Sequence, residues 1–593
     1  MTAPRYIGLA GPVADRSRDW ISRVVQAART AGLNLVFQTD HLIVLSNTAT
    51  AALTTTGQLG VAVGTVFDRG GSSRAPYRKA PTVHLPGLAG EDIMRVYWGG
   101  YVAFIVDDSE DAVHVLRDPS GSLDCYRSRE DGVDVVYSDL SVATELGLVK
   151  GEPDPNAVLH HLAYASLRTE RTCLFDVNEV LPGTSVRLGA GRAPTVRSIW
   201  TPWTFAAKPA QLVDPAEARA VVRLETQRCV SAWADQYPHI HHELSGGLDS
   251  SIIAACLADR TKTLTCMTYL TPENGADERA YAQEVADWIG APLEAVTLSL
   301  NDSDLGDMAS ELTARPGSGI LHQVLNRSLT READRTGVPV FFSGGGGDNV
   351  FCYIKTAAPA VDALRRFGPG VVFLNSLGDL AALHGCTSWH AAHLTLRKLF
   401  RPLRGLPRNV DFLAPGAAPS GPEPHPWLKA PPGAQHGSHE HILWLTAAQA
   451  PLSSQAHHGE APICYPLLSQ PVVEACLRVP SWMWIAGGRN RAMARDAFAA
   501  ALPPAILQRR TKGDFTGLLG ALYQKHRVEL DDLLLEGWLA SRVLLDRAAI
   551  AAYLRSDRPT TDYRFCRLME IASAEVWARS WLGSTASTVF PRT

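Results

Sequence analysis

Short hydrophobic runs separated by turn residues dominate roughly the first 200 residues. The clearest runs lie at residues 35–37, 41–45, 96–106 and 133–137. Runs of this length, rich in Val, Ile, Tyr and Phe, are typical of β-strands. The pattern changes after a proline-containing segment, because a helical pattern then begins at residue 216. We therefore expect a β-rich domain over residues 1–205 and a second domain over residues 206–593.

From residue 239 onward, strands and helices alternate. The spacing predicts strands over residues 239–244, 263–270 and 293–298, with helices over residues 250–259 and 277–288 between them. Consecutive units of this kind form a parallel, doubly wound sheet that binds ligands at the carboxyl ends of its strands. Residues 401–437 contain nine prolines, so we expect a long irregular loop or a partly disordered lid there.

Residues 245–250 form the turn between the first predicted strand and helix of this unit, with the sequence Ser-Gly-Gly-Leu-Asp-Ser. Unpaired backbone N–H groups and the positive end of the helix dipole favour phosphate at such a turn. The turn lacks the lysine of the common P-loop, so γ-phosphate transfer is not the expected chemistry. The expected ATP and pyrophosphate contacts are Leu244, Ser245, Gly246, Gly247, Asp249, Ser250, Met267, Ser343, Gly344 and Arg510.

A second buried strand, predicted within residues 338–342, runs into the glycine-rich residues 343–348. Asp249 and Asp348 thus both follow strands and are expected at the same edge of the sheet. Mg²⁺ prefers oxygen ligands and takes one or two protein carboxylates beside substrate phosphates. We expect these two aspartates to hold Mg²⁺, although the glycine run alone would also suit a flexible turn.

A basic segment near the C-terminus supplies charge for a leaving pyrophosphate. Residues 489–495 begin a predicted helix, and residues 509–515 follow a Leu-Pro-Pro turn. A fixed cation stabilises a transition state most where negative charge develops. We interpret Lys512 as this catalytic cation, and Arg489 and Arg509 as parts of a solvated basic face.

The composition of the chain excludes several classes of protein function. A chain of 593 residues with 46% hydrophobic and 20% charged residues fits a globular enzyme of roughly two to four domains. Its net charge of −4 argues against a nucleic-acid partner, and its apolar runs are too short to span a membrane. The ten cysteines are scattered without metal spacing, and the N-terminus lacks a signal-peptide pattern. We expect a cytoplasmic protein with reduced thiols and no membrane partner.

In combination, these motifs resemble the asparagine-synthetase superfamily over nearly the whole chain. Residues 245–250 match its SGGLDS loop, residues 343–348 are similar to its second glycine loop, and residues 510–515 match its R-x-K-x-x-F segment. Residues 98–108 and 117–126 resemble segments of its N-terminal half. The resemblance implies an α+β domain like that of N-terminal-nucleophile hydrolases, followed by an α/β ATP pyrophosphatase (PP-loop) synthetase domain. It also implies ATP and Mg²⁺ as cofactors.

The glutaminase chemistry of that family is not expected here. The family places a cysteine nucleophile directly after the initiator methionine, where this chain has Thr2. A threonine with a free amine can also be a nucleophile, so Thr2 alone does not exclude hydrolysis. However, residues 61–68 also lack the Asn-Gly of the family's oxyanion segment. Residues 1–205 are therefore interpreted as a vestigial class II amidotransferase domain, and an amine other than glutamine must supply the nitrogen.

Among relatives without this cysteine, the sequence looks most like the lasso-peptide macrolactam cyclases. The β-lactam synthetases carry Glu or Tyr where this chain has Gly345. A peptide α-amine with a pKa of ~8 needs no strong base, and Gly345 is expected to make room for a peptide. The resemblance implies adenylation of an Asp or Glu side chain in a leader-free peptide. Attack by the peptide N-terminal amine then closes an isopeptide ring and releases AMP, after pyrophosphate.

The precursor peptide is thus the expected substrate, and its partners could include a leader-removing protease and a leader-binding protein. Candidate substrate contacts are Gly345, Asp277, Glu278, Tyr281, His458 and Glu460. The acidic pair also suits an ordinary helix N-terminus, and His458 an ordinary loop. Two alternatives stay open: a small-molecule amide ligase, either β-lactam synthetase-like or ammonia-dependent asparagine synthetase, and an inactive partner-binding homologue.

Overall fold

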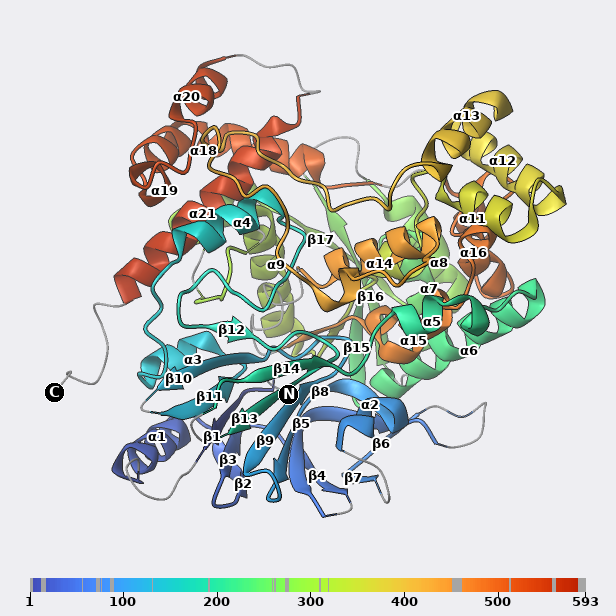
Figure 1. Cartoon of the computed structure of the whole chain (residues 1–593). Helices are drawn as coiled ribbons and strands as arrows, with labels where there is room; N and C mark the ends of the chain where they lie inside the picture. Colours follow the sequence, from blue (N-terminus) through green and yellow to red (C-terminus); the bar gives the residue numbers. More distant parts are fainter. Residues whose placement is uncertain are drawn as a thin grey trace.

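The chain combines a two-sheet N-terminal domain with a second domain built on a parallel sheet (Figure 1). No helix among the described residues is both long and apolar enough to cross a membrane. All ten cysteines are unpaired. The computed structural model describes residues 4–584 except 12–17, 56, 71–74, 76, 86–89, 131, 190–191, 259, 261–262, 272–276, 309–310, 318, 451–460, 511–512 and 557–561.

Two mainly antiparallel sheets pack face to face in the N-terminal domain. Their strand orders are β12-β10-β11-β1-β3-β2 and β14-β13-β9-β8-β5-β4-β7, with β6 paired to β5. Alternate side chains such as Val44 and Phe104 fill the space between the sheets. The strands are β1 Tyr6–Ala10, β2 Asn34–Gln38, β3 Leu42–Ser46, β4 Thr50–Thr55, β5 Leu59–Asp68, β6 Arg78–Lys79, β7 Thr82–Leu85, β8 Tyr97–Asp107, β9 Ala112–Arg117, β10 Tyr126–Glu130, β11 Val133–Tyr137, β12 Asn178–Glu179, β13 Thr184–Gly189 and β14 Thr195–Ser198.

Helices cover the outer face of each sheet. Helices α1 (Arg18–Thr30), α3 (Leu140–Glu145) and α4 (Pro155–Ala163) share a hydrophobic core with the first sheet. Helices α6 (Pro215–Ala234) and α15 (Gln470–Leu477) of the second domain cover the second sheet, where Trp233 packs against Trp98. The predicted α+β class is therefore confirmed. The expected boundary at residues 205 and 206 falls within the short helix α5 (Trp203–Ala206), which lies between β14 and α6.

Five parallel strands in the order β17-β16-β15-β18-β19 form the core of the second domain, which confirms the predicted sheet type. The first three predicted strands and both predicted helices agree with the structure to within two residues. Helix α8 ends at Gly290, whose φ of 69° suits glycine. The elements are β15 His239–Glu243, α7 Leu248–Leu257, β16 Thr263–Leu270, α8 Arg279–Ile289, β17 Leu293–Thr297, α9 Ile320–Thr336, β18 Phe341–Phe342 and β19 Ile463–Cys464.

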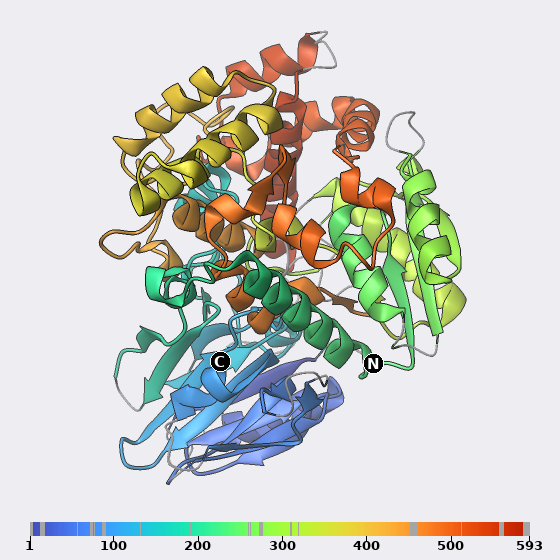
Figure 2. The ribbon, with the colours of Figure 1, turned by 90° about the vertical axis from the view of Figure 1, so that its right-hand side faces the viewer.

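Further helices surround this sheet. Helices α11–α13 project as a lobe from one side of the molecule, and α18–α21 form a separate group (Figures 1 and 2). The latter group shares its hydrophobic core with α1 and α3, so one core extends across both domains. These helices are α10 Gly347–Val350, α11 Ala358–Phe367, α12 Val371–His384, α13 Ser388–Leu399, α14 His436–Ala448, α16 Ala492–Ala497, α17 Pro504–Gln508, α18 Thr516–Leu535, α19 Trp538–Ser541, α20 Arg547–Arg555 and α21 Arg564–Ser584; the short helices α2 Ile93–Val96 and α5 Trp203–Ala206 lie earlier in the chain.

The segment predicted as a helix at residues 489–495 is only partly helical. Arg489–Asn490 is instead the short strand β21, paired with β20 (Ile485–Ala486). Arg491 then adopts a left-handed φ of 55°, and α16 starts at the next residue. The prediction was wrong for the first residues because the hairpin partner lies outside the basic segment itself.

The proline-rich residues 401–437 are largely irregular, as predicted. Their backbone is fixed to the N-terminal domain, since the Asn409 N–H donates to the Ala163 carbonyl at 3.0 Å. It is also fixed to the C-terminal helices, because the Ala414 N–H donates to the Leu544 carbonyl at 2.9 Å. The segment is therefore a strap across both domains.

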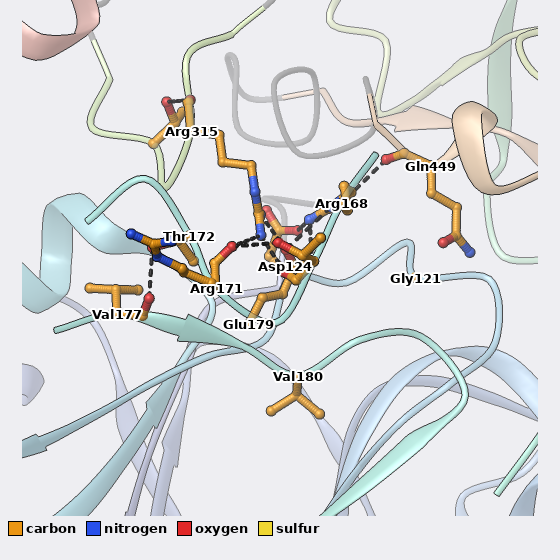
Figure 3. A network of polar contacts seen from close by, with 12 residues as sticks. Gly121, Asp124, Arg168, Arg171, Thr172, Val177, Glu179, Val180, Arg315 and Gln449 are labelled. Carbon is orange, nitrogen blue, oxygen red and sulfur yellow. Dashed lines mark hydrogen bonds and ion pairs between the residues drawn. The ribbon is translucent and has the colours of Figure 1, made fainter. Parts of the chain in front are cut away.

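A buried ion network lies where the domains meet (Figure 3). Glu179 accepts hydrogen bonds from Arg117 at 2.6 Å, from Arg168 and from Arg315 of the second domain. Arg117 and Arg168 also pair with Asp124, at 3.2 and 3.3 Å. Burial raises the pKa of Glu179, but the three guanidinium groups outweigh burial and lower this pKa to about 2. The network therefore depends on Glu179 remaining ionised.

We expect Glu179→Gln to lower the free energy of unfolding by about 3–5 kcal/mol at neutral pH, because it leaves three buried cations short of countercharge. Since the folded pKa lies below the ordinary 4.5, the stability that Glu179 contributes is present above pH 4.5 and is lost as pH falls toward 2. Denaturant unfolding at several pH values checks both points. Glu110→Gln, at an exposed ion pair with Arg187, should cost less than ~1 kcal/mol. Equal stability of Glu179→Gln and wild type would contradict the prediction.

Candidate active site

A cavity of about 450 Å³ opens at the carboxyl ends of β15, β16 and β18. From β15 the sheet continues through β16 and β17 on one side and through β18 and β19 on the other. Such a reversal of strand order creates a crevice, because the loops after neighbouring strands turn apart. The loops at residues 245–250 and 343–348 border this crevice.

The loop at residues 245–250 is held closed by its own hydroxyl groups. The Gly247 N–H donates to the Ser245 hydroxyl at 3.3 Å, and the Ser251 hydroxyl donates to the Gly247 carbonyl at 2.7 Å. Gly246 has a φ of 65°, and a Cβ there would lie 2.4 Å from the Cβ of Tyr281. The loop therefore packs tightly against α8, with the N-terminus of α7 at the cavity.

Asp249 and Asp348 converge, but the guanidinium of Arg491 lies between them. Its Nη1 is 2.8 and 2.9 Å from the two carboxylate oxygens of Asp249 and 2.6 Å from Oδ1 of Asp348. Burial lowers the pKa of Arg491, but the two carboxylates outweigh burial and raise it overall. Both carboxylates thus already share one cationic atom, and this arrangement fits a divalent cation once Arg491 moves aside.

Arg509 is not part of a solvated face, contrary to the prediction. Its Nη1 donates to the Gly246 carbonyl at 3.0 Å, it pairs with Glu278, and its guanidinium lies 4.0 Å from the centre of the Tyr281 ring. It therefore ties the loop at residues 245–250 to the start of α8. Arg489 is 35% exposed in its side chain and approaches Asp496 at 3.7 Å, consistent with the predicted surface position.

Gly345 lines the cavity and packs beside an aromatic ring. A Cβ at Gly345 would lie 2.7 Å from the ring of Tyr465, which follows β19. That Gly345 makes room for a substrate stays a prediction, and the structure adds that a larger side chain at this position would collide with Tyr465, from a segment more than a hundred residues away. The glycine accommodates an aromatic ring.

A carboxylate that the sequence analysis missed also lines the cavity. Glu243 is the last residue of β15 and accepts a hydrogen bond from the Tyr269 hydroxyl at 2.6 Å. Burial raises the pKa of Glu243, although hydrogen bonds from Ser343 and Tyr269 act in the opposite direction. Its position two residues before the SGGLDS loop was the only sequence signal available.

The structure brings most of the predicted nucleotide contacts together. Gly246 shapes the loop, whereas Arg510 lines a neighbouring cavity. Asp277 is exposed and paired with Arg279 at 2.6 Å, and Tyr281 packs on Arg509, so neither lines the first cavity. Thr2, His458, Glu460 and Lys512 lie outside the described residues. The predicted residues that line the cavity are Leu244, Ser245, Gly247, Asp249, Ser250, Met267, Glu278, Ser343, Gly344, Gly345 and Asp348.

A family model described as asparagine synthase matches residues 223–579. No curated protein matches the chain. Among solved structures, glutamine phosphoribosylpyrophosphate amidotransferase from B. subtilis, complexed with ADP and GMP, is 8% identical with a TM-score of 0.22, over 50% of this chain and 91% of that chain. The U34-tRNA thiolase NcsA from Methanococcus maripaludis is 21% identical with a TM-score of 0.16, over 26% of this chain and 53% of that chain. TM-scores of this size do not establish a shared fold.

We expect Gly246→Ala to weaken ATP binding by about tenfold or more. A left-handed residue other than glycine costs about 1–2 kcal/mol, and its Cβ would push the loop away from Tyr281. Gly247→Ala is the matched control, because φ is −73° there and the Cβ would meet only the Ser245 hydroxyl, at 3.2 Å. Isothermal titration calorimetry with ATP separates the two. Similar affinities for both variants would argue against the loop geometry described above.

Proposed function

Because the chain belongs to the asparagine synthase family, a family of ATP-dependent amide ligases, we propose that it is a lasso-peptide cyclase. It would activate an Asp or Glu side chain of a leader-free peptide and join it to the peptide's own N-terminal amine. The observation that carries the proposal is the meeting of the phosphate loop with Asp249 and Asp348 in one crevice. This arrangement suits cleavage of ATP between its α- and β-phosphates.

The proposed reaction has two steps. A carboxylate oxygen of the peptide attacks the α-phosphorus of ATP, and the bond to the β-phosphate oxygen breaks to release pyrophosphate. The N-terminal amine then attacks the acyl carbon, loses a proton, and displaces AMP. Mg²⁺ would neutralise phosphate charge in the first step.

Different residues of the site would carry out the parts of this reaction. The N-terminus of α7 would hold phosphate, and Asp249 and Asp348 would hold the metal ion after Arg491 leaves them. Lys512 would stabilise charge on the departing pyrophosphate. Glu243 lines the cavity and would accept the proton of the attacking amine, because its raised pKa brings it closer to neutral pH.

The N-terminal domain bears on which molecule supplies the nitrogen of the new amide bond. Residues 61–68, which would have to supply an oxyanion site, lie inside β5. That strand is paired with β4 on one side and with β8 on the other. β8 pairs with all of residues 59–68, whereas β4 pairs only with residues 59–63 and β6 only with residues 67 and 68. The position of residues 61–68 within a sheet, together with their lack of Asn-Gly, supports a vestigial amidotransferase domain and an amine from the substrate.

One observation favours the second candidate, a small-molecule ligase of the β-lactam synthetase type. The hydrogen-bonded pair of Tyr269 and Glu243 would serve a reaction that needs a strong base. The Tyr465 ring also occupies the space above Gly345, near the place where those synthetases carry a side chain. The substrate therefore has to be tested directly.

We expect the protein, ATP and Mg²⁺ to convert a leader-free precursor peptide into a product lighter by one water, with one AMP formed per ring. Mass spectrometry combined with an AMP assay checks this. Asp249→Asn and Asp348→Asn should stop AMP formation, because each removes a metal-binding charge. Amide formation with small amino acids but not with peptides would favour the second candidate. Absence of AMP with all substrates would support an inactive homologue.

We also expect Glu243→Gln to slow ring closure by ~10²-fold while ATP affinity stays within about threefold. In the wild-type protein the rate should rise with pH through the raised pKa of Glu243, because the ionised form accepts the proton. This dependence should disappear in the variant. Asp287→Asn, on α8 outside the cavity, is the control. An unchanged pH profile for Glu243→Gln would remove Glu243 from the mechanism.

A further inference from the structure

A second cavity, of about 500 Å³, adjoins the candidate active site, and we call it the basic chamber. The two cavities share part of their walls, and Arg491 and Asp348 lie on the boundary between them. The lining residues of the basic chamber are Asp348, Asn349, Tyr353, Lys355, Leu383, Trp444, Gly488, Arg489, Asn490, Arg491, Arg495, Arg509 and Arg510. Six of these residues are Lys or Arg, and only Asp348 is acidic.

Some of these cations are occupied by the protein itself. Arg495 donates to four backbone carbonyls, including those of Ile506 and Leu507 at 2.9 and 2.8 Å. Burial, together with Arg491 and Arg489, lowers the pKa of Arg495 to about 10, which leaves it charged at neutral pH. Arg495 therefore contributes fixed positive charge to the wall of the chamber.

Other cations are available to a ligand. Lys355 makes no hydrogen bond or ion pair with another described residue, and its ammonium lies 4.8 Å from the centre of the Trp444 ring. Arg489 has only the distant Asp496, and Arg510 is exposed without an ion-pair partner in the described part of the chain. The chamber thus presents at least three accessible cations and two arginine forks. Arginine forks match phosphate oxygens well.

Arg491 connects this chamber to the phosphate loop. Its Nη1 contacts Asp249 and Asp348, whereas its Nε is buried without a hydrogen-bond partner among the described residues. A buried donor without a partner is costly, and the left-handed φ of 55° adds strain. Both features suit a side chain that changes partners when an anion arrives.

We propose that the basic chamber binds inorganic pyrophosphate after its release and is its route out of the active site. This rests on the proposed function, in which pyrophosphate is released beside Asp348. The ion carries several negative charges, and Lys355, Arg489, Arg495 and Arg510 on this half-enclosed wall are not neutralised by a close ion pair among the described residues, so the wall attracts it. The chamber itself makes and breaks no bond. Its ligand is a diphosphate, either free or as the tail of ATP, and the experiment distinguishes these two sources.

The test compares pyrophosphate and ATP as probes, with the full-length protein and isothermal titration calorimetry. We expect the double variant Lys355→Met, Arg489→Gln to weaken pyrophosphate binding by about tenfold, while ATP binding changes less than about threefold. The matched control is Arg23→Gln, Lys150→Met, which removes the same charges from exposed positions of the N-terminal domain. It should change neither affinity.

Two outcomes would overturn the proposal. Equal weakening of ATP and pyrophosphate would mean that the chamber holds the nucleotide tail, and unchanged pyrophosphate affinity would mean that it does not bind this anion. Both measurements are made without peptide. Failure of the cyclase proposal would instead appear as wild-type protein that forms no AMP with peptide, so the two failures are distinguishable.

Discussion

The contact of Arg491 with Asp249 and Asp348 holds the candidate active site together. It joins three segments that are 143 and 242 residues apart in sequence, each at a loop where regular structure begins or ends. Two carboxylates this close would repel one another without a cation. The same side chain separates the crevice from the basic chamber. The unliganded loops therefore keep their positions through a charge that the reaction itself has to displace.

Local sequence patterns were sufficient to predict much of this architecture. The strand β15, the turn after it and the helix α7 follow from residues that are neighbours in sequence, and so does the position of the crevice at the carboxyl end of β15. The roles of Arg491, Arg509 and Tyr465 could not be predicted in this way. Each depends on a contact with a segment far along the chain, and such contacts leave no periodic signal. A basic run looks the same whether its arginines face solvent or a phosphate loop.

The N-terminal domain has a structural role that is independent of any hydrolysis. Arg315 of the second domain reaches Glu179 in the first, and one hydrophobic core includes helices from both. Pairing of Glu179 with three cations offsets the cost of burying them. The sheet that contains β5 therefore has a structural role whether or not β5 supplies an oxyanion site.

The strap at residues 401–437 makes the two domains structurally dependent on each other. The backbone of the strap is hydrogen-bonded to the end of α4 in one domain and to the segment after α19 in the other. Either domain on its own would therefore leave some of these hydrogen-bonding groups without their partners. Deleting the first domain would therefore expose apolar core and leave backbone groups of the strap without hydrogen-bond partners, whatever chemistry that domain performs. The first domain is thus part of the framework that positions the second, independently of any reaction of its own.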